Sequence, residues 1–164
     1  MTINQKELEL IKYPNKILQT KAVNVELFDK NRLENLFKIM TSIMNILNGV
    51  GLAANQVGLN DNLFVANISF IDSVENKVYE KPNIFINPTI IKKTYKTNVK
   101  TEGCLSVDNY TPKIERHKEI ILEFQTIDGL LLQIPFKDFD ARVIQHEIDH
   151  LNGITLANKI DNLK

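Results

Sequence analysis

Two histidines and a glutamate in the segment 146–150, with sequence HEIDH, have the spacing of a metal site. In a helix, His146 and His150 lie one turn apart on the same face, close enough to bind one metal ion. Glu147 then lies beside the metal, where a carboxylate can accept a proton from water. A solvent-exposed polar helix is the alternative, because a pattern that fixes only three positions also arises by chance.

A catalytic metal site of this kind needs a third protein ligand. After His150 the chain has no histidine or glutamate, and Asp161 is the only acidic residue. The upstream candidates are His117, several carboxylates and Cys104, the only cysteine. A thiolate would supply negative charge that neutral imidazoles lack, and the glycine before it allows close backbone approach to a ligand. A lone cysteine is also common as a small buried apolar residue, so both interpretations stay open.

A third segment, residues 49–56, is rich in glycine and alanine and ends with Gln56. It contains neither Gly-Lys-Ser/Thr nor a GxGxxG pattern, which argues against a phosphate loop. A helix end followed by a tight buried loop explains the glycines but leaves the amide unexplained.

These three segments, in this order, resemble the peptide deformylase family. The family signature is GφGφAAxQ, then EGCLS, then QHExDHLxG, and residues 49–56, 102–106 and 145–153 match every signature position. The resemblance covers nearly the whole chain, because further positions also look similar to the family: Tyr13-Pro14, Leu18, Arg116, Phe139 and residues 141–143.

The resemblance implies a set of site residues. Cys104, His146 and His150 would hold one divalent metal ion. Glu147 would be the general base, and the side-chain amide of Gln56 and the backbone N–H of Leu105 would donate to the oxyanion. The residues implied to border the substrate are Val50, Gly51, Gly103, Phe139 and Val143. Simple core packing is an equal alternative for the last two, which share a helical stripe with the histidines.

The implied activity is a metal-dependent hydrolase that removes the N-formyl group from the formyl-methionine of newly made polypeptides and releases formate. One thiolate and two imidazoles suit zinc, ferrous iron, cobalt or nickel; the family typically uses ferrous iron. N-formyl-methionyl nascent peptides and the ribosome are the implied partners of an enzyme expected to be monomeric. A zinc endopeptidase of the HExxH type is disfavoured because it would need a downstream ligand. A non-catalytic metal-binding homologue is disfavoured because Glu147 and Gln56 are intact.

Composition limits the function classes. A length of 164 residues predicts one catalytic domain over 1–164, and a hydrophobic fraction of 43% is ordinary for a globular protein. A net charge of zero gives no case for sequence-specific nucleic-acid binding or for an anionic membrane. With one cysteine, no disulfide can form within the chain. No apolar signal core or membrane-spanning run is found, so a cytoplasmic location is expected.

The elements that must position these residues follow from hydrophobic periodicity. Apolar residues with helical spacing predict a long N-terminal amphipathic helix over 29–47, and a final helix over 138–152 carries the HExxH motif. Strands are expected at 63–66, 84–91, 119–126 and 130–134, with a turn at 127–129 and a hairpin loop or strand edge at 72–82. The predicted fold class is α+β, with mixed antiparallel sheets packed around the C-terminal helix, as the resemblance also implies.

Several neighbouring residues are also given expectations. Asp149 is predicted to pair with Arg116, Glu102 to anchor the segment of Cys104, and His117 to be exposed to solvent. Residues 107–108 are Val-Asp, whereas many family members have Ile-Pro there. Because this change removes a rigid proline and adds a charge near the substrate groove, we expect altered preference beyond the first substrate residue.

Overall fold

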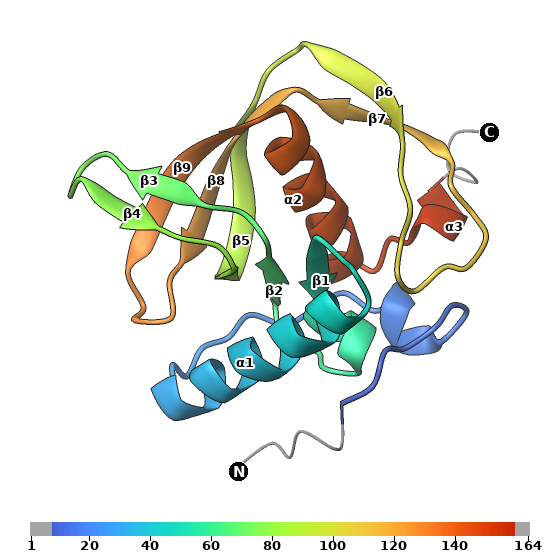
Figure 1. The fold of residues 1–164 in the computed structure, drawn as a ribbon, viewed down its shortest axis with the longest axis horizontal. Coiled ribbons are helices and arrows are strands. Elements are labelled where there is room, and N and C mark those ends of the chain that lie inside the picture. Colours follow the sequence, from blue (N-terminus) through green and yellow to red (C-terminus); the bar gives the residue numbers. More distant parts are fainter. Residues whose placement is uncertain (1–7, 160–164) are drawn as a thin grey trace.

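Antiparallel strands and a helix near the C-terminal end dominate the computed structural model, which describes residues 8–159 (Figure 1). The helices are η1 (Lys16–Gln19), α1 (Lys30–Ile46), η2 (Ala54–Val57), α2 (Asp138–Leu151) and α3 (Leu156–Lys159). The strands are β1 (Gly51–Ala53), β2 (Leu63–Ala66), β3 (Phe70–Asp72), β4 (Lys77–Tyr79), β5 (Asn83–Lys93), β6 (Thr97–Thr101), β7 (Lys113–His117), β8 (Glu119–Gln125) and β9 (Leu131–Lys137).

The largest sheet is antiparallel and has the strand order β1-β2-β5-β8-β9, while β3-β4 and β6-β7 form separate two-stranded sheets. Strands β8 and β9 bury every second residue, which gives the sheet one core face and one outer face. The buried members are Ile120, Leu122, Phe124, Leu132, Ile134 and Phe136. Both strands were predicted as short β-like runs, and their burial alternates in the structure.

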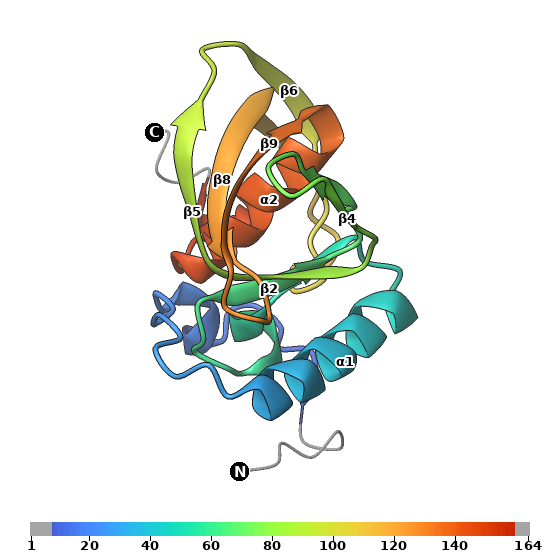
Figure 2. The same cartoon turned by 90° about the vertical axis from the view of Figure 1, so that its left-hand side faces the viewer.

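Helix α2 lies in the hollow of the curved sheets (Figures 1 and 2). It contacts β1, β2, β7, β8 and β9, so it is buried on most of its circumference instead of along one stripe. Its buried residues therefore include polar ones, which must find partners inside the protein. They are Arg142, Gln145, Glu147 and His150.

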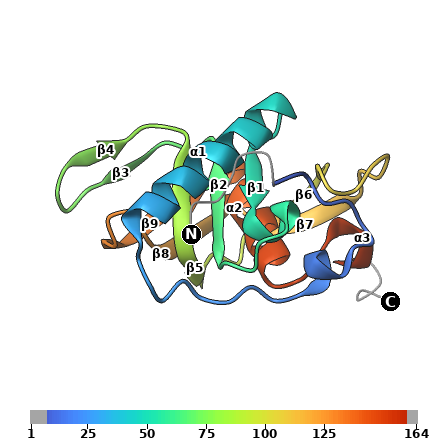
Figure 3. The ribbon, with the colours of Figure 1, turned by 90° about the horizontal axis from the view of Figure 1, so that it is seen from below.

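Helix α1 packs on β1 and β2 (Figure 3). Figures 1 and 2 show it separate from α2. Asp29 caps its first turn by accepting a hydrogen bond from the backbone N–H of Arg32 at 3.1 Å. Leu33, Leu36, Met40 and Met44 form its buried stripe. The helix ends before Asn48, which has a φ of 55°, and the chain then turns into β1.

The structure modifies several predicted boundaries. The helices expected over 29–47 and 138–152 are α1 and α2, and the strand expected at 63–66 is β2. The strand expected at 130–134 starts one residue later and extends to Lys137. The tight buried loop that was considered as an alternative for the glycine-rich segment does not include Gly51–Ala53, which pair with β2 as an edge strand. Strands β6 and β7 were not predicted because each is short and mostly polar.

Within residues 8–159, the structure contains no helix with the length and apolar character needed to cross a membrane.

Candidate metal centre and active site

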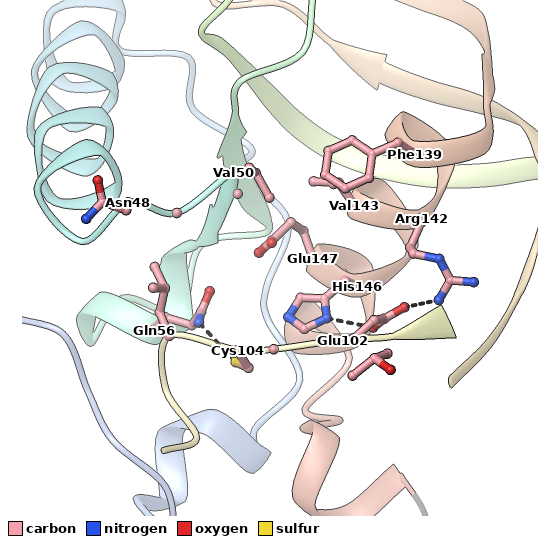
Figure 4. Close-up of a pocket in the computed structure, with 15 residues that line it drawn as sticks. Asn48, Val50, Gln56, Glu102, Cys104, Phe139, Arg142, Val143, His146 and Glu147 are labelled. Atoms are coloured by element: carbon pink, nitrogen blue, oxygen red, sulfur yellow. Dashed lines mark hydrogen bonds and ion pairs between the residues drawn. The ribbon is translucent and has the colours of Figure 1, made fainter. Parts of the chain in front are cut away.

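Cys104, His146 and His150 come together in one cluster. Cys104 and His146 also line a cavity (Figure 4). The sulfur of Cys104 lies 3.2 Å from Nε2 of His150, and the two histidine Nε2 atoms are also 3.2 Å apart. All three donor atoms lie within 4.8 Å of one another. The helix supplies the two histidines from adjacent turns, and the segment between β6 and β7 supplies the cysteine.

The donor set fits a divalent transition-metal ion. Metal–nitrogen bonds of about 2.1 Å at a tetrahedral angle place two nitrogens roughly 3.4 Å apart, close to the spacing seen here. Nδ1 of His146 lies 3.0 Å from Oε2 of Glu102, which leaves Nε2 free to bind a metal. Burial lowers the pKa of His146, but Cys104, Glu102 and Glu147 outweigh it and raise this pKa to about 10. Such negative groups also favour a bound cation.

Glu102 is held by two buried arginines as well as by His146. Arg116 donates to both of its carboxylate oxygens at 2.9 Å, and Arg142 donates to Oε1 at 2.5 Å. Burial alone would raise the pKa of Glu102, but these partners lower it well below its usual range. Arg116 also pairs with Asp149. The predicted Arg116–Asp149 pair and the anchoring of Glu102 are therefore both present.

Glu147 occupies a different environment. Its side chain is 3% exposed and its Oε2 has no hydrogen-bond partner among the described residues. Burial raises the pKa of Glu147 to about 7, although His146 and Arg116 oppose this shift. A buried carboxyl group with an unused oxygen and a pKa near neutrality is suited to accept and return a proton.

Gly51 makes the position of Glu147 possible. A β-carbon at residue 51 would lie 2.3 Å from Oε1 of Glu147. No side chain other than hydrogen fits between strand β1 and this carboxylate. The glycine is therefore explained by close approach of the backbone to a functional group.

Hydrogen bonds to both its oxygen and its nitrogen fix the orientation of the Gln56 amide. Its Oε1 accepts a hydrogen bond from the backbone N–H of Ala53 at 2.9 Å, so its Nε2 faces Cys104. That nitrogen donates to the hydroxyl of Ser106 at 3.0 Å and lies 3.7 Å from the sulfur of Cys104. Leu105, whose backbone N–H was the second predicted donor, follows Cys104 in the same cavity wall.

The cavity has a volume of about 380 Å³. All the residues predicted to border the substrate line it: Val50, Gly51, Gly103, Phe139 and Val143. Val143 is 5% exposed and also belongs to the core, whereas Phe139 is 57% exposed. Val143 therefore both packs in the core and lines the cavity, whereas Phe139 is not a core residue.

The prediction for His117 was wrong, and two polar residues around the site, Arg142 and Asn55, had no predicted role. His117 was expected to be solvent-exposed but is half-buried, with its Nδ1 2.7 Å from the carbonyl of Thr94. Arg142 had no predicted role, although its position four residues before His146 on a helix was a usable signal. Asn55 is fully buried and donates to the carbonyl of His150 at 2.5 Å, and no sequence pattern indicated this contact.

Comparison with known proteins places this site in a family. The model of the family described as polypeptide deformylase matches residues 7–164. The chain belongs to the polypeptide deformylase family. The peptide deformylase of Borreliella burgdorferi is 40% identical over 147 residues, which cover 90% of this chain and 84% of that protein.

Solved deformylase structures share the fold over most of both chains. The crystal structure of the Thermotoga maritima peptide deformylase has a TM-score of 0.80 and 34% identity, and it covers 92% of this chain and 95% of that one. A Met-Ala-Ser-bound structure of the class I type b enzyme from Acinetobacter baumannii has a TM-score of 0.82 and 30% identity, with 97% and 99% covered. The family is metal-dependent, and the Cys/His/His cluster described above could hold the metal.

Proposed function

We propose that this chain removes the formyl group from the N-terminal formyl-methionine of newly made polypeptides, releasing formate and a free amino terminus. One arrangement carries this proposal. Cys104, His146, Glu147 and Gln56 line one cavity, and His150 completes the cluster of three candidate metal ligands with the first two. The Oε2 atom of Glu147 has no hydrogen-bond partner among the described residues. Family membership supports a metal-dependent hydrolase of this substrate class.

The residues divide the chemistry among them. Cys104, His146 and His150 would hold a divalent ion, which supplies Lewis-acid chemistry that makes water a stronger nucleophile at neutral pH. Glu147 accepts the proton of the attacking water and then returns it to the leaving amine. Gln56 Nε2 and the N–H of Leu105 donate hydrogen bonds to the formyl oxygen as negative charge develops on it.

Strand β1 offers a place for the substrate backbone. It stands at the end of the five-stranded sheet, and the carbonyl of Val50 accepts from the N–H of Asn67 on the inner side. Antiparallel ladders alternate, so the N–H and carbonyl of Gly51 face the open edge beside the cavity. We propose that an extended peptide pairs with this edge, as peptides commonly do with exposed strands. Val50, Phe139 and Val143 would then contact the methionine side chain.

Further proposals concern the metal and the setting. We propose ferrous iron as the working ion, because the donor set accepts it and the family resemblance implies it. We also propose that residues 1–164 act as a single catalytic domain around α2 and its HExxH motif. In this proposal the enzyme is a cytoplasmic monomer that meets nascent chains at the ribosome.

The decisive experiment measures formate release from formyl-Met-Ala-Ser by protein that is purified anaerobically and whose bound metal is quantified. We expect rapid release by the wild type, with a large loss in a Glu147→Ala variant that keeps its metal. A folded, metal-loaded wild type that releases no formate would overturn the proposal. Casein cleavage without formate release would instead indicate an endopeptidase.

A further inference from the structure

The N-terminal segment is bonded to both segments that carry the proposed oxyanion donors. The backbone N–H of Ile11 donates to the carbonyl of Gln56 at 2.7 Å. The backbone N–H of Tyr13 donates to the carbonyl of Ser106 at 2.9 Å. The residues on either side of Lys12 thus connect η2 to the loop that follows the metal-site cysteine.

Lys12 completes this connection through its side chain. Its Nζ donates to the carbonyl of Leu105 at 2.9 Å and to the carboxylate of Asp108 at 2.5 Å. The ammonium therefore spans the tight turn in which the N–H of Val107 donates to the carbonyl of Cys104 at 3.2 Å. The Leu105 donor sits inside this turn, between the metal-site cysteine and the ion pair.

We infer that Lys12 and Asp108 are positioning residues that hold the backbone donor of Leu105 in place for catalysis. This inference rests on the proposed function. The side chains are 48% and 67% exposed, so their ion pair adds little to global stability. The placement of an oxyanion donor is far more sensitive, because displacement by about 1 Å can cost on the order of 10²-fold in rate.

The ion pair also accounts for the Val107-Asp108 sequence. A proline at residue 108 would restrain the turn by fixing φ. With aspartate there, the chain has no such restraint, and the contact with Lys12 provides one from outside the turn. Asn109 follows with a φ of 54°, and the position before such a residue in a tight turn accepts proline.

An alternative role can be separated by kinetics. A second cavity of about 320 Å³ is lined by Lys12, Asp108 and Tyr110 and shares residues 103–105 with the catalytic cavity. If the ion pair acted mainly by contacting the downstream part of the peptide, its loss would raise KM. Positioning of a donor used in the transition state instead lowers kcat and leaves KM nearly unchanged.

The test compares Lys12→Met and Asp108→Asn with wild type, using formyl-Met-Ala-Ser. We expect each variant to lose about fivefold in kcat, the factor appropriate to an exposed ion pair, with KM within about twofold and metal content unchanged. Lys12→Arg should retain most of the activity. The matched control is Lys30→Met, which breaks the exposed Lys30–Asp128 pair at 2.7 Å in another part of the fold and should leave kcat unchanged.

A proline variant tests the restraint itself. Asp108→Pro should keep kcat within about twofold of wild type, and Lys12→Met should cost less in that background than in wild type. Added KCl should lower kcat of the wild type through screening of the pair, with a smaller effect on Asp108→Pro.

Two results would overturn the inference. One is wild-type kcat in both Lys12→Met and Asp108→Asn. The other is a loss confined to KM or to thermal stability. Absence of formate release by the wild type would count against the proposed function instead, so the two failures are distinguishable.

Discussion

Replacing Gly51 with alanine should remove most of the activity by moving one carboxylate. The new β-carbon would lie 2.3 Å from Oε1 of Glu147, 2.8 Å from its Cδ and 3.0 Å from its Cγ. Favourable non-bonded contacts between heavy atoms begin at about 3.5 Å, so the carboxylate has to move by roughly 1 Å. Strand β1 is paired with β2 and yields less readily than a side chain.

A displacement of this size has a large expected cost. Moving a catalytic group by about 1 Å can reduce the rate on the order of 10²-fold, which corresponds to about 2.7 kcal/mol in activation free energy. The clash is with Glu147 and not with a metal-ligating atom, so the metal content of Gly51→Ala should equal that of wild type.

Steady-state formate release measures the loss of rate in Gly51→Ala, and metal analysis of the same samples measures its metal content. Gly103→Ala is the matched comparison, because Gly103 lines the same cavity and its β-carbon would meet nothing closer than Thr111 Cγ2 at 3.9 Å. We expect that variant to lose less than about tenfold.

The reasoning can be refuted with a double variant. In a Glu147→Ala background the carboxylate is gone, so adding Gly51→Ala should cost almost nothing further. A further loss near 10²-fold in that background would show that Gly51 acts by some route other than Glu147.

Three further predictions concern single residues. Gln56→Ala should lower kcat about 10²–10³-fold with little change in KM, measured by formate release, because it removes one oxyanion donor. Arg116→Ala should lower the free energy of unfolding by about 3–5 kcal/mol in urea titrations and weaken metal retention, because Glu102 loses its bidentate partner; unchanged metal content and activity would exclude this role. Gly153→Ala should destabilise by about 1–3 kcal/mol without changing kcat at 25 °C, because residue 153 has a φ of 74° and its β-carbon would lie 2.7 Å from a backbone oxygen of Gln19.

Elements with strong periodicity could be predicted from the sequence, and weakly patterned ones could not. Helix α1 buries one stripe, and β8 and β9 bury alternate residues, so local spacing carries their structure. Strand β1 has three residues, all buried, and shows no alternation. Its conformation depends on pairing with β2, which lies ten or more residues further along the chain, and local propensity does not contain that information.

The same distinction holds for the candidate site: residues with helical spacing could be predicted from the sequence, and those that depend on the packed fold could not. Helical spacing places His146, Glu147 and His150 without knowledge of the fold. The position of Cys104 relative to them depends on how the segment after β6 crosses α2, and only the family resemblance indicated it. The roles of Arg142 and Asn55 come from burial of polar groups around α2, which requires the whole packed structure.

Two glutamates beside the candidate metal site illustrate how the fold can give one type of side chain two different environments. Glu102 has two arginines as partners, which lower its pKa and keep it charged. Glu147 is also buried, yet its Oε2 has no hydrogen-bond partner among residues 8–159, and burial raises its pKa to about 7. The charged group can orient His146 throughout the proposed reaction cycle, and the other can exchange a proton within it. Exchanging these tasks would require moving the arginines, because the difference resides in the partners and not in the carboxyl groups.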